Sequence, residues 1–267
     1  MVKMGITKYE AHVLASMPYK EPYVFHFTFG VEMETVHCPA SSFMSAAGAQ
    51  GISAVNNLSH YNHHDIPQFK LVPDSSIYGS NPAECVTPAL DGNESGYDLL
   101  KRCCKALAQV GATVNSSCGL HVHIGAGDLS EKEYCNVFFN YQRIEKAIDS
   151  FMAESRRANN SHWCATLKNH DLSHCTTRNH VYHELSGDRY HKVNPCAYDR
   201  HKTIEFRQHQ GTVNFAKIKA WVGFLGKLVE YSKEHRIAGD IDRIEDIPFL
   251  TQDEKAFFIG RREQLNN

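Results

Sequence analysis

The sequence has no apolar run that approaches the roughly 20 residues needed to span a bilayer. Its N-terminal segment, MVKMGITKYEAHVLASMPYK, also has no continuous apolar core of the kind found in secretory signals. There is no long run of like charge, and the formal net charge of the 267-residue chain is −2, so bulk electrostatics does not favour nucleic acid or a membrane surface as a partner. We therefore expect a cytoplasmic protein that acts on small molecules or peptides.

Several motifs that would indicate other chemistry are absent. There is no G-x-x-x-x-G-K-[ST] phosphate-binding loop, and GAGD at 125–128 does not complete a dinucleotide-binding fingerprint. The chain has no C-x-x-C pair, and its nine cysteines are an odd number scattered from Cys38 to Cys196. These features argue against a disulfide framework and favour small, reduced, mostly buried thiols.

What is present is ordinary globular composition, with 42% hydrophobic and 22% charged residues. The length is enough for one sizeable domain. We predict a single catalytic domain over 1–267, in which 1–22 is an N-terminal extension and 233–267 is a C-terminal helical tail.

Four helices are predicted from apolar periodicity and from residues that cap helix ends. One covers 97–110 and ends before Gly111, after which a strand is expected at 113–114. A second begins at Ser130, with Glu133 completing a capping box. A third begins near Asn214, and a short fourth is indicated by Thr251 with Glu254.

Three segments alternate apolar and polar residues with the period of two that is typical of strands, namely 23–34, 119–125 and 203–209. A bulge at Gly30 could reset the phase of the first strand, but two of its carboxylates would still share a face. The polar residues offered to one side are His26, Thr28, Glu32 and Glu34 in the first strand, His121 and His123 in the second, and Glu205, Arg207 and His209 in the third.

Each polar pair has more than one interpretation. Glu32 and Glu34 lie ~7 Å apart along a strand and suit Mg²⁺ or Mn²⁺, or they form a solvated face. The pair His121 and His123 is compatible with two satisfied side chains, a zinc or iron site, or donors to phosphate. Glu205-x-Arg207 combines a metal ligand with a guanidinium suited to phosphate, or forms a salt bridge.

Taken together, the pairs point to metal and phosphate binding. A sheet face that carries several carboxylates, two imidazoles and a guanidinium is hard to stabilise without counter-ions. Divalent cations and a polyphosphate supply both signs of charge. Glu84, in GSNPAECVTPAL, is a further candidate ligand, and Asp74, in PDSS, either binds a metal or forms a turn.

Two polar segments, 35–68 and 156–188, are expected to be loops that cover the site. The second contains residues that form either a separate zinc site or a solvated loop, namely His162, Cys164, His170, His174 and Cys175. The histidines of HYNHHD, at 60, 63 and 64, are expected on the surface. Arg156 and Arg157 either complement a helix dipole or reach the substrate or nucleotide.

An ordered set of segments carries a resemblance to a known family: FGVEME at 29–34, PDSS at 73–76, AECVTPAL at 83–90, CGLHVHIG at 118–125, RYHKVNP at 189–195 and TIEFRQHQGT at 203–212. The sequence resembles the amidoligase family, which is grouped with glutamine synthetases and glutamate–cysteine ligases, over about residues 24–230. The resemblance implies an α+β fold like that of glutamine synthetase. Its curved, largely antiparallel sheet would have helices packed on the outer face.

The resemblance also implies chemistry, in which ATP phosphorylates a carboxylate and an amine then displaces phosphate. ATP and two or more Mg²⁺ or Mn²⁺ ions are the implied cofactors, and small-molecule or peptide carboxylates and amines are the implied substrates. The implied metal ligands are Glu32, Glu34, Glu84, His121 and Glu205. Nucleotide or substrate contacts are implied for His121, His123, Arg207 and Asn194, and catalytic roles for Arg189, Arg207 and Glu205.

Two alternatives remain from the sequence. A metal-dependent amide hydrolase could bind zinc through the His-x-His pair and activate water. A relative without catalysis could keep the nucleotide site alone. The identities of both substrates and the oligomeric state are left open.

Overall fold

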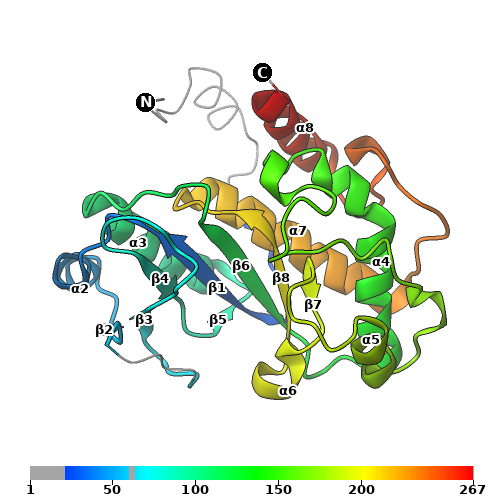
Figure 1. Cartoon of the computed structure of the whole chain (residues 1–267), viewed down its shortest axis with the longest axis horizontal. Helices are drawn as coiled ribbons and strands as arrows, with labels where there is room; N and C mark the ends of the chain where they lie inside the picture. Colours follow the sequence, from blue (N-terminus) through cyan, green and yellow to red (C-terminus); the bar gives the residue numbers. More distant parts are fainter. Residues whose placement is uncertain (1–21, 60–63, 267) are drawn as a thin grey trace.

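A single eight-stranded sheet runs through the protein (Figure 1), and the computed structural model describes residues 22–59 and 64–266. The strands lie in the order β2-β3-β4-β1-β6-β8-β7, and β5 pairs with β1. Of the described strand pairs only β2 and β3 are parallel, so the α+β class and the largely antiparallel sheet are confirmed. The strands are β1 (Thr28–Thr35), β2 (Ala54–Asn56), β3 (Phe69–Val72), β4 (Ala83–Val86), β5 (Leu90–Asp91), β6 (Gly119–Gly125), β7 (Val193–Asn194) and β8 (Thr203–Gln210).

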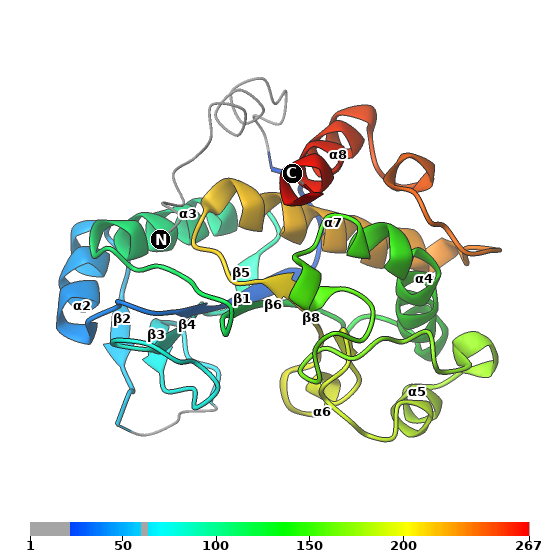
Figure 2. The ribbon, with the colours of Figure 1, turned by 45° about the horizontal axis from the view of Figure 1, so that its top comes forward.

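Helices cover one face of this sheet and leave much of the other to the polar side chains. Figure 2 shows α3 and α7 on one side and α6 on the opposite side, with α8 outside α7. The covered face is apolar because Phe29, Val31 and Met33 of β1 point into the core. The helices are α2 (Ala40–Ala49), α3 (Glu94–Gln109), α4 (Glu131–Asp149), α5 (Arg178–Glu184), α6 (Ala197–His201), α7 (Phe215–Glu234) and α8 (Gln252–Asn266). None of the helices in the described ranges is long and apolar enough to cross a bilayer.

Three of the four predicted helix starts are confirmed by their caps, whereas α3 begins at Glu94, after its cap Asn93, and not at residue 97. Ser130 Oγ accepts from the backbone N–H of Glu133, whose carboxylate accepts in turn from the backbone of Ser130. Asn214 caps α7, and Thr251 interacts with Glu254 at the start of α8. The thiol prediction also holds, since all nine cysteines are free and eight are buried.

Two predictions about local structure are wrong. The segment 35–68 is not simply a loop, because it contains α2 and β2; α2 buries only Phe43, Ala46 and Ala47, an apolar stripe too small to stand out in the sequence. No strand forms at 113–114, where Thr113 makes only an isolated bridge to Val36. The bulge considered at Gly30 is absent, since β1 pairs with β6 in unbroken register.

The alternation predicted for β8 breaks before His209. A register shift between β6 and β8 places His209 opposite Leu120, an apolar core residue. The His209 ring therefore lies on the helix-covered face, 5.8 Å from the ring of Trp221 in α7. The prediction that His209 shares a face with Glu205 is wrong.

Burial of His209 predicts a pH-dependent stability. Burial lowers its pKa to about 3, whereas the unfolded chain takes up this proton near pH 6.5. The folded state therefore loses stability as the pH falls below that value, by ~2 kcal/mol between pH 6.5 and pH 5. Urea denaturation of His209→Gln should show a shallower loss than wild type over this range. The same change at exposed His26 is the control, and equal slopes in all three proteins would contradict the prediction.

Candidate functional site

Strand register brings the predicted polar residues onto the open face of the sheet. Glu32 pairs with His121 across β1 and β6, and His123 pairs with Glu205 across β6 and β8. Glu34 pairs with Glu84 across β1 and β4. Because directly paired residues project to the same side of a sheet, acids and imidazoles from four strands meet there.

These side chains form three overlapping groups, in each of which one ligand atom per residue lies within 4.8 Å of the others. The groups are Glu32, His123 and Glu205; Glu32, Glu84 and His121; and Glu34, Asp74 and Glu84. Glu32 and Glu84 each belong to two groups, so the three form a continuous row. Carboxylate oxygens with one or two imidazoles are a donor set that suits Mg²⁺ or Mn²⁺.

Asp74 has both of the roles considered for it. Its Oδ1 accepts from the backbone N–H and the hydroxyl of Ser76, at 2.7 Å and 2.6 Å, which is a local turn contact. Its carboxylate also contributes to the group with Glu34 and Glu84. The turn thus presents an acid to the row.

The pKa values of two carboxylates of the row, Glu32 and Glu84, are shifted in opposite directions. Burial alone would raise the pKa of Glu32, but the imidazoles of His121 and His123 hold it well below its ordinary value. Burial raises the pKa of Glu84 well above its ordinary value, and the charges of Glu32, Glu34 and Asp74 raise it further. Glu84 is thus a buried acid in a field of negative charge, which a cation would relieve.

The two histidines leave ring nitrogens available to a ligand. His121 Nδ1 donates to Glu32 Oε2 at 3.1 Å, which leaves Nε2 facing Glu34 Oε1 at 3.5 Å. His123 Nδ1 bonds Thr203 Oγ1 at 2.9 Å. Its buried Nε2 has no hydrogen-bond partner among the described residues and lies 3.4 Å from Glu32 Oε1. A buried imidazole nitrogen beside a carboxylate, without a hydrogen bond, fits a metal ligand.

Arg207 and Asn194 hold Glu205 in place. Arg207 Nη1 donates to Glu205 Oε1, and Asn194 Nδ2 donates to Glu205 Oε2. Burial would raise the pKa of Glu205, but the Arg207 charge and His123 lower it. Glu205 is therefore an ionised carboxylate whose position is fixed from two sides, and both predicted neighbours lie in the site.

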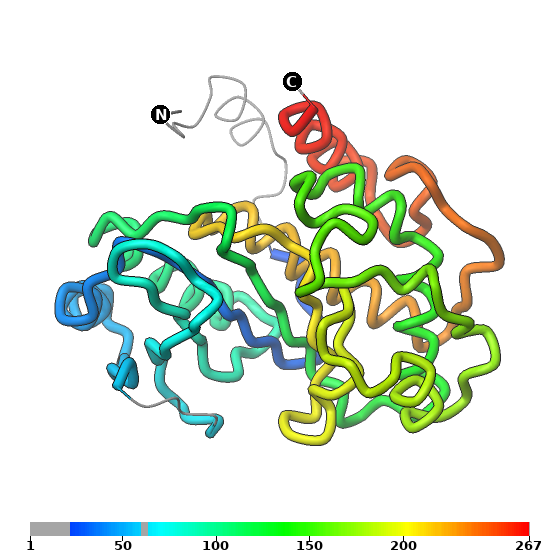
Figure 3. Tube along the Cα trace, in the orientation of Figure 1, coloured from blue at the N-terminus to red at the C-terminus, as the bar shows by residue number. Residues whose placement is uncertain are grey.

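The loop beside Arg207 is anchored by a buried ion pair. Lys192 is fully buried, and its Nζ lies 2.9 Å from Glu145 Oε1 and 2.6 Å from Asp149 Oδ1. The Glu145 carboxylate also accepts from the backbone N–H of Leu167 at 2.9 Å. The traces of 160–168 and 188–194 run beside each other (Figure 3), bridged at Ala165 and His191. This arrangement fixes the loop that carries the Trp163 carbonyl, 3.4 Å from Arg207 Nε.

Arg189 is not brought into the acidic row. It is exposed, and its guanidinium lies over the Tyr190 ring at 5.1 Å, on which Arg207 also lies at 5.8 Å. Arg189 therefore occupies the rim of the site, and its catalytic role stays a prediction.

A separate zinc site is not formed by the His- and Cys-rich loop. Within the described ranges, no three metal-ligating atoms of His162, Cys164, His170, His174 and Cys175 come within 4.8 Å of one another. Instead His170 Nε2 bonds His191 Nε2 at 3.2 Å. Cys164 and Cys175 are buried, whereas His162 and His174 are exposed, as expected for a solvated loop.

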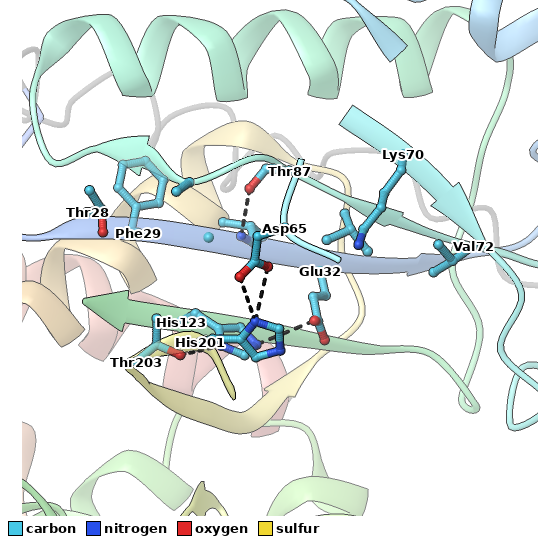
Figure 4. Close-up of a pocket in the computed structure, with 14 residues that line it drawn as sticks. Thr28, Phe29, Glu32, Asp65, Lys70, Val72, Thr87, His123, His201 and Thr203 are labelled. Carbon is cyan, nitrogen blue, oxygen red and sulfur yellow. Dashed lines mark hydrogen bonds and ion pairs between the residues drawn. The ribbon is translucent and has the colours of Figure 1, made fainter. Parts of the chain in front are cut away.

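A pocket that is partly open to solvent adjoins Glu32 and His123 (Figure 4). Asp65 and His201 approach each other across it at 3.0 Å. Lys70, only 7% exposed, extends into it from β3 and donates to the His64 carbonyl at 3.0 Å. The lining residues are Thr28, Phe29, Gly30, Val31, Glu32, Asp65, Lys70, Val72, Val86, Thr87, Ala89, His123, His201 and Thr203.

Several of these lining residues were not predicted. The sequence signal for Lys70 is a lysine inside the otherwise apolar run FKLV, all four residues of which are buried in β3. Asp65 belongs to HYNHHD, whose histidines were expected on the surface; His64 is exposed as predicted, and His60 and His63 lie outside the described residues. His201 reaches the pocket from α6, far away in the sequence.

The fold and this face define an α+β domain with a row of candidate metal ligands beside a pocket. Residues 26–229, which are most of the chain, match the sequence model of the family described as "putative amidoligase enzyme", and the protein belongs to this family. The predicted family is thus confirmed, and with it a ligase type of enzyme. A comparison with curated proteins finds no match to this chain.

Proposed function

We propose that the protein is an ATP-dependent carboxylate–amine ligase that forms an amide or isopeptide bond through an acyl phosphate. The observation that supports it most is the row of three overlapping acid and imidazole groups beside the pocket that contains Lys70. Transfer of a phosphoryl group requires positioning and neutralisation of charge more than a covalent nucleophile. A row of this kind fits that requirement.

The residues fit bound divalent cations in number and kind. Glu32, His123 and Glu205 would hold one ion, and Glu34, Asp74 and Glu84 another, with His121 between them. When bound, Mg²⁺ or Mn²⁺ would neutralise phosphate oxygens and polarise the phosphoryl group.

The chain's own groups have separate tasks in this proposal. The pocket offers apolar contacts from Val72, Val86 and Ala89 to a base and ribose. Lys70 supplies a positive charge for phosphate oxygens, and Arg207, fixed beside Glu205, supplies a second. Asn194 keeps Glu205 oriented while the reactants bind.

The proposed reaction balances in two steps. A carboxylate oxygen of the donor attacks the γ-phosphorus of ATP, the bond to the β,γ-bridging oxygen breaks, and ADP leaves. The amine then attacks the acyl carbon, the bond from carbon to the phosphate oxygen breaks, and inorganic phosphate leaves with that electron pair. The amine nitrogen loses a proton to solvent or to a nearby base.

The test is ADP release with hydroxylamine as a small acceptor. Protein, Mg²⁺, ATP and pooled carboxylic acids should yield one hydroxamate per ADP, and EDTA should reduce both products at least 100-fold. Absence of nucleotide turnover with every pool would contradict the proposal. One tightly held zinc with amide cleavage in the absence of nucleotide would favour the hydrolase alternative instead.

A further inference from the structure

Arg156 is a buried guanidinium without an acidic partner. It is 6% exposed and lies in the 3₁₀ turn Glu154–Arg156 that follows α4. Its Nη2 donates to the Cys118 carbonyl at 2.9 Å. No carboxylate oxygen of residues 22–59 or 64–266 lies within 4.0 Å of it, although a buried charge is costly unless it is paired.

The guanidinium borders the end of the acidic row that contains Glu34. Gly119 joins the two, because its backbone N–H donates to Glu34 Oε2 at 2.6 Å. A Cβ on Gly119 would meet His121 Nε2 at 3.2 Å and Arg156 Nη1 at 3.3 Å. The absence of a side chain at Gly119 thus lets the guanidinium lie close to an imidazole nitrogen of the row with no carbon between them.

The Arg156 guanidinium is distant from the pocket proposed for the nucleotide. The pocket is lined by His123, four residues along β6 from Gly119, which at the rise of a strand is about 13 Å. A group at Arg156 would therefore lie at the other end of the row, close to where Glu34, Asp74 and Glu84 meet.

We infer that Arg156 binds a second anionic group of the carboxylate donor, so that the donor is a short acid with two negative groups. This inference rests on the proposed function, in which the first carboxylate of the donor is the one phosphorylated. Arg156 is the specificity residue, because its planar fork bonds an anion that a monocarboxylate lacks.

The test compares acids with one and two anionic groups. Monocarboxylates, α,ω-dicarboxylates and phosphonocarboxylates with four to six carbons are each given with ATP, Mg²⁺ and hydroxylamine. The doubly anionic acids should have the lower KM, and Arg156→Gln should raise that KM about 10- to 100-fold without changing the KM for ATP. If the α,ω-dicarboxylates have the lower KM, the second group is a carboxylate. If the phosphonocarboxylates have the lower KM, it is a phosphonate.

Two further variants separate binding from folding. Arg157→Gln is the matched control, since this adjacent arginine instead donates to Met152 O and Asn266 Oδ1 and should leave both KM values unchanged. Gly119→Ala places a methyl group against His121 Nε2 and Arg156 Nη1 and should raise the KM for the same acids. Arg156→Gln should keep or raise the Tm, because it removes an unpaired buried charge, whereas a purely structural arginine would lower the Tm.

Calorimetry without nucleotide keeps the two proposals distinguishable. Glutarate, titrated in the presence of Mg²⁺, should bind wild type more tightly than Arg156→Gln. Such binding without any ADP release would retain Arg156 as the binding residue for a doubly anionic acid and would overturn the ligase proposal. Two results would overturn the inference and retain the ligase. One is turnover of monocarboxylates that equals that of the doubly anionic acids and is unaffected by Arg156→Gln; the other is an Arg156→Gln variant in which only the KM for ATP is raised. Neither turnover nor Arg156-dependent binding would overturn both.

Discussion

Glu84→Gln is expected to abolish ATP turnover and yet raise the Tm of the metal-free protein by several degrees. Glu84 is buried among Glu32, Glu34 and Asp74, and burial followed by their repulsion raises its pKa. The unfolded chain ionises this carboxyl at its ordinary pKa, so the folded state binds more protons at pH values above that point. Stability therefore falls as the pH rises through this window, and glutamine removes the deficit at pH 7.

Divalent cations should reverse the order of stability. Glu84 belongs to two of the three acid groups, so 5 mM MgCl₂ or MnCl₂ should raise the Tm of wild type more than that of the variant. Turnover should fall at least 1,000-fold, because the ion proposed to bind Glu34, Asp74 and Glu84 loses a ligand. Thermal scans with EDTA and with metal, together with ADP release, measure both effects. The exposed Glu154→Gln is the control; a variant that is less stable than wild type in EDTA would show that Glu84 is a structural residue.

The candidate site could largely be predicted because strand alternation is a local property. Glu32 and Glu34 share a face whatever the rest of the chain does, and so do His121 and His123. That Glu32 would pair with His121, and Glu84 with Glu34, depends on register. Register is set by long-range packing. The sequence therefore predicted which face of the sheet these side chains occupy, but not which residues they pair with on the neighbouring strands.

The parts that were missed come from distant or weakly marked segments. Asp65 and His201 are 136 residues apart and meet only through the tertiary fold. His209 was assigned to the wrong face because the register shift between β6 and β8 leaves no mark in the alternating pattern. Arg156 followed a predicted helix end, where a dipole contact was an equally good interpretation. That no acid of residues 22–59 or 64–266 pairs with it depends on the tertiary fold.

Replacing Arg207 is expected to lower both the stability and the turnover, and a second substitution at Glu205 should restore the stability alone. Arg207 donates to the buried Glu205, and its pKa is raised because the attraction of Glu205 outweighs burial. Arg207→Gln would leave Glu205 ionised and buried, which destabilises a protein by about 3–5 kcal/mol. It would also remove a positive charge proposed to act on phosphate, and turnover should fall roughly 1,000-fold.

A double variant tests whether the stability loss is caused by the unpaired carboxylate. Arg207→Gln with Glu205→Gln should regain most of the lost stability in urea denaturation without metal, because no buried charge remains, but it should stay inactive. The pH dependence has a defined sign: Arg207 lowers the pKa of Glu205, so the stability it contributes is present above the ordinary pKa of a glutamate and is lost as the pH falls. The deficit of the single variant should therefore shrink toward pH 4. A double variant as unstable as Arg207→Gln at pH 7 would mean that Arg207 stabilises the fold through its contacts with Trp163 and Tyr190 rather than through charge.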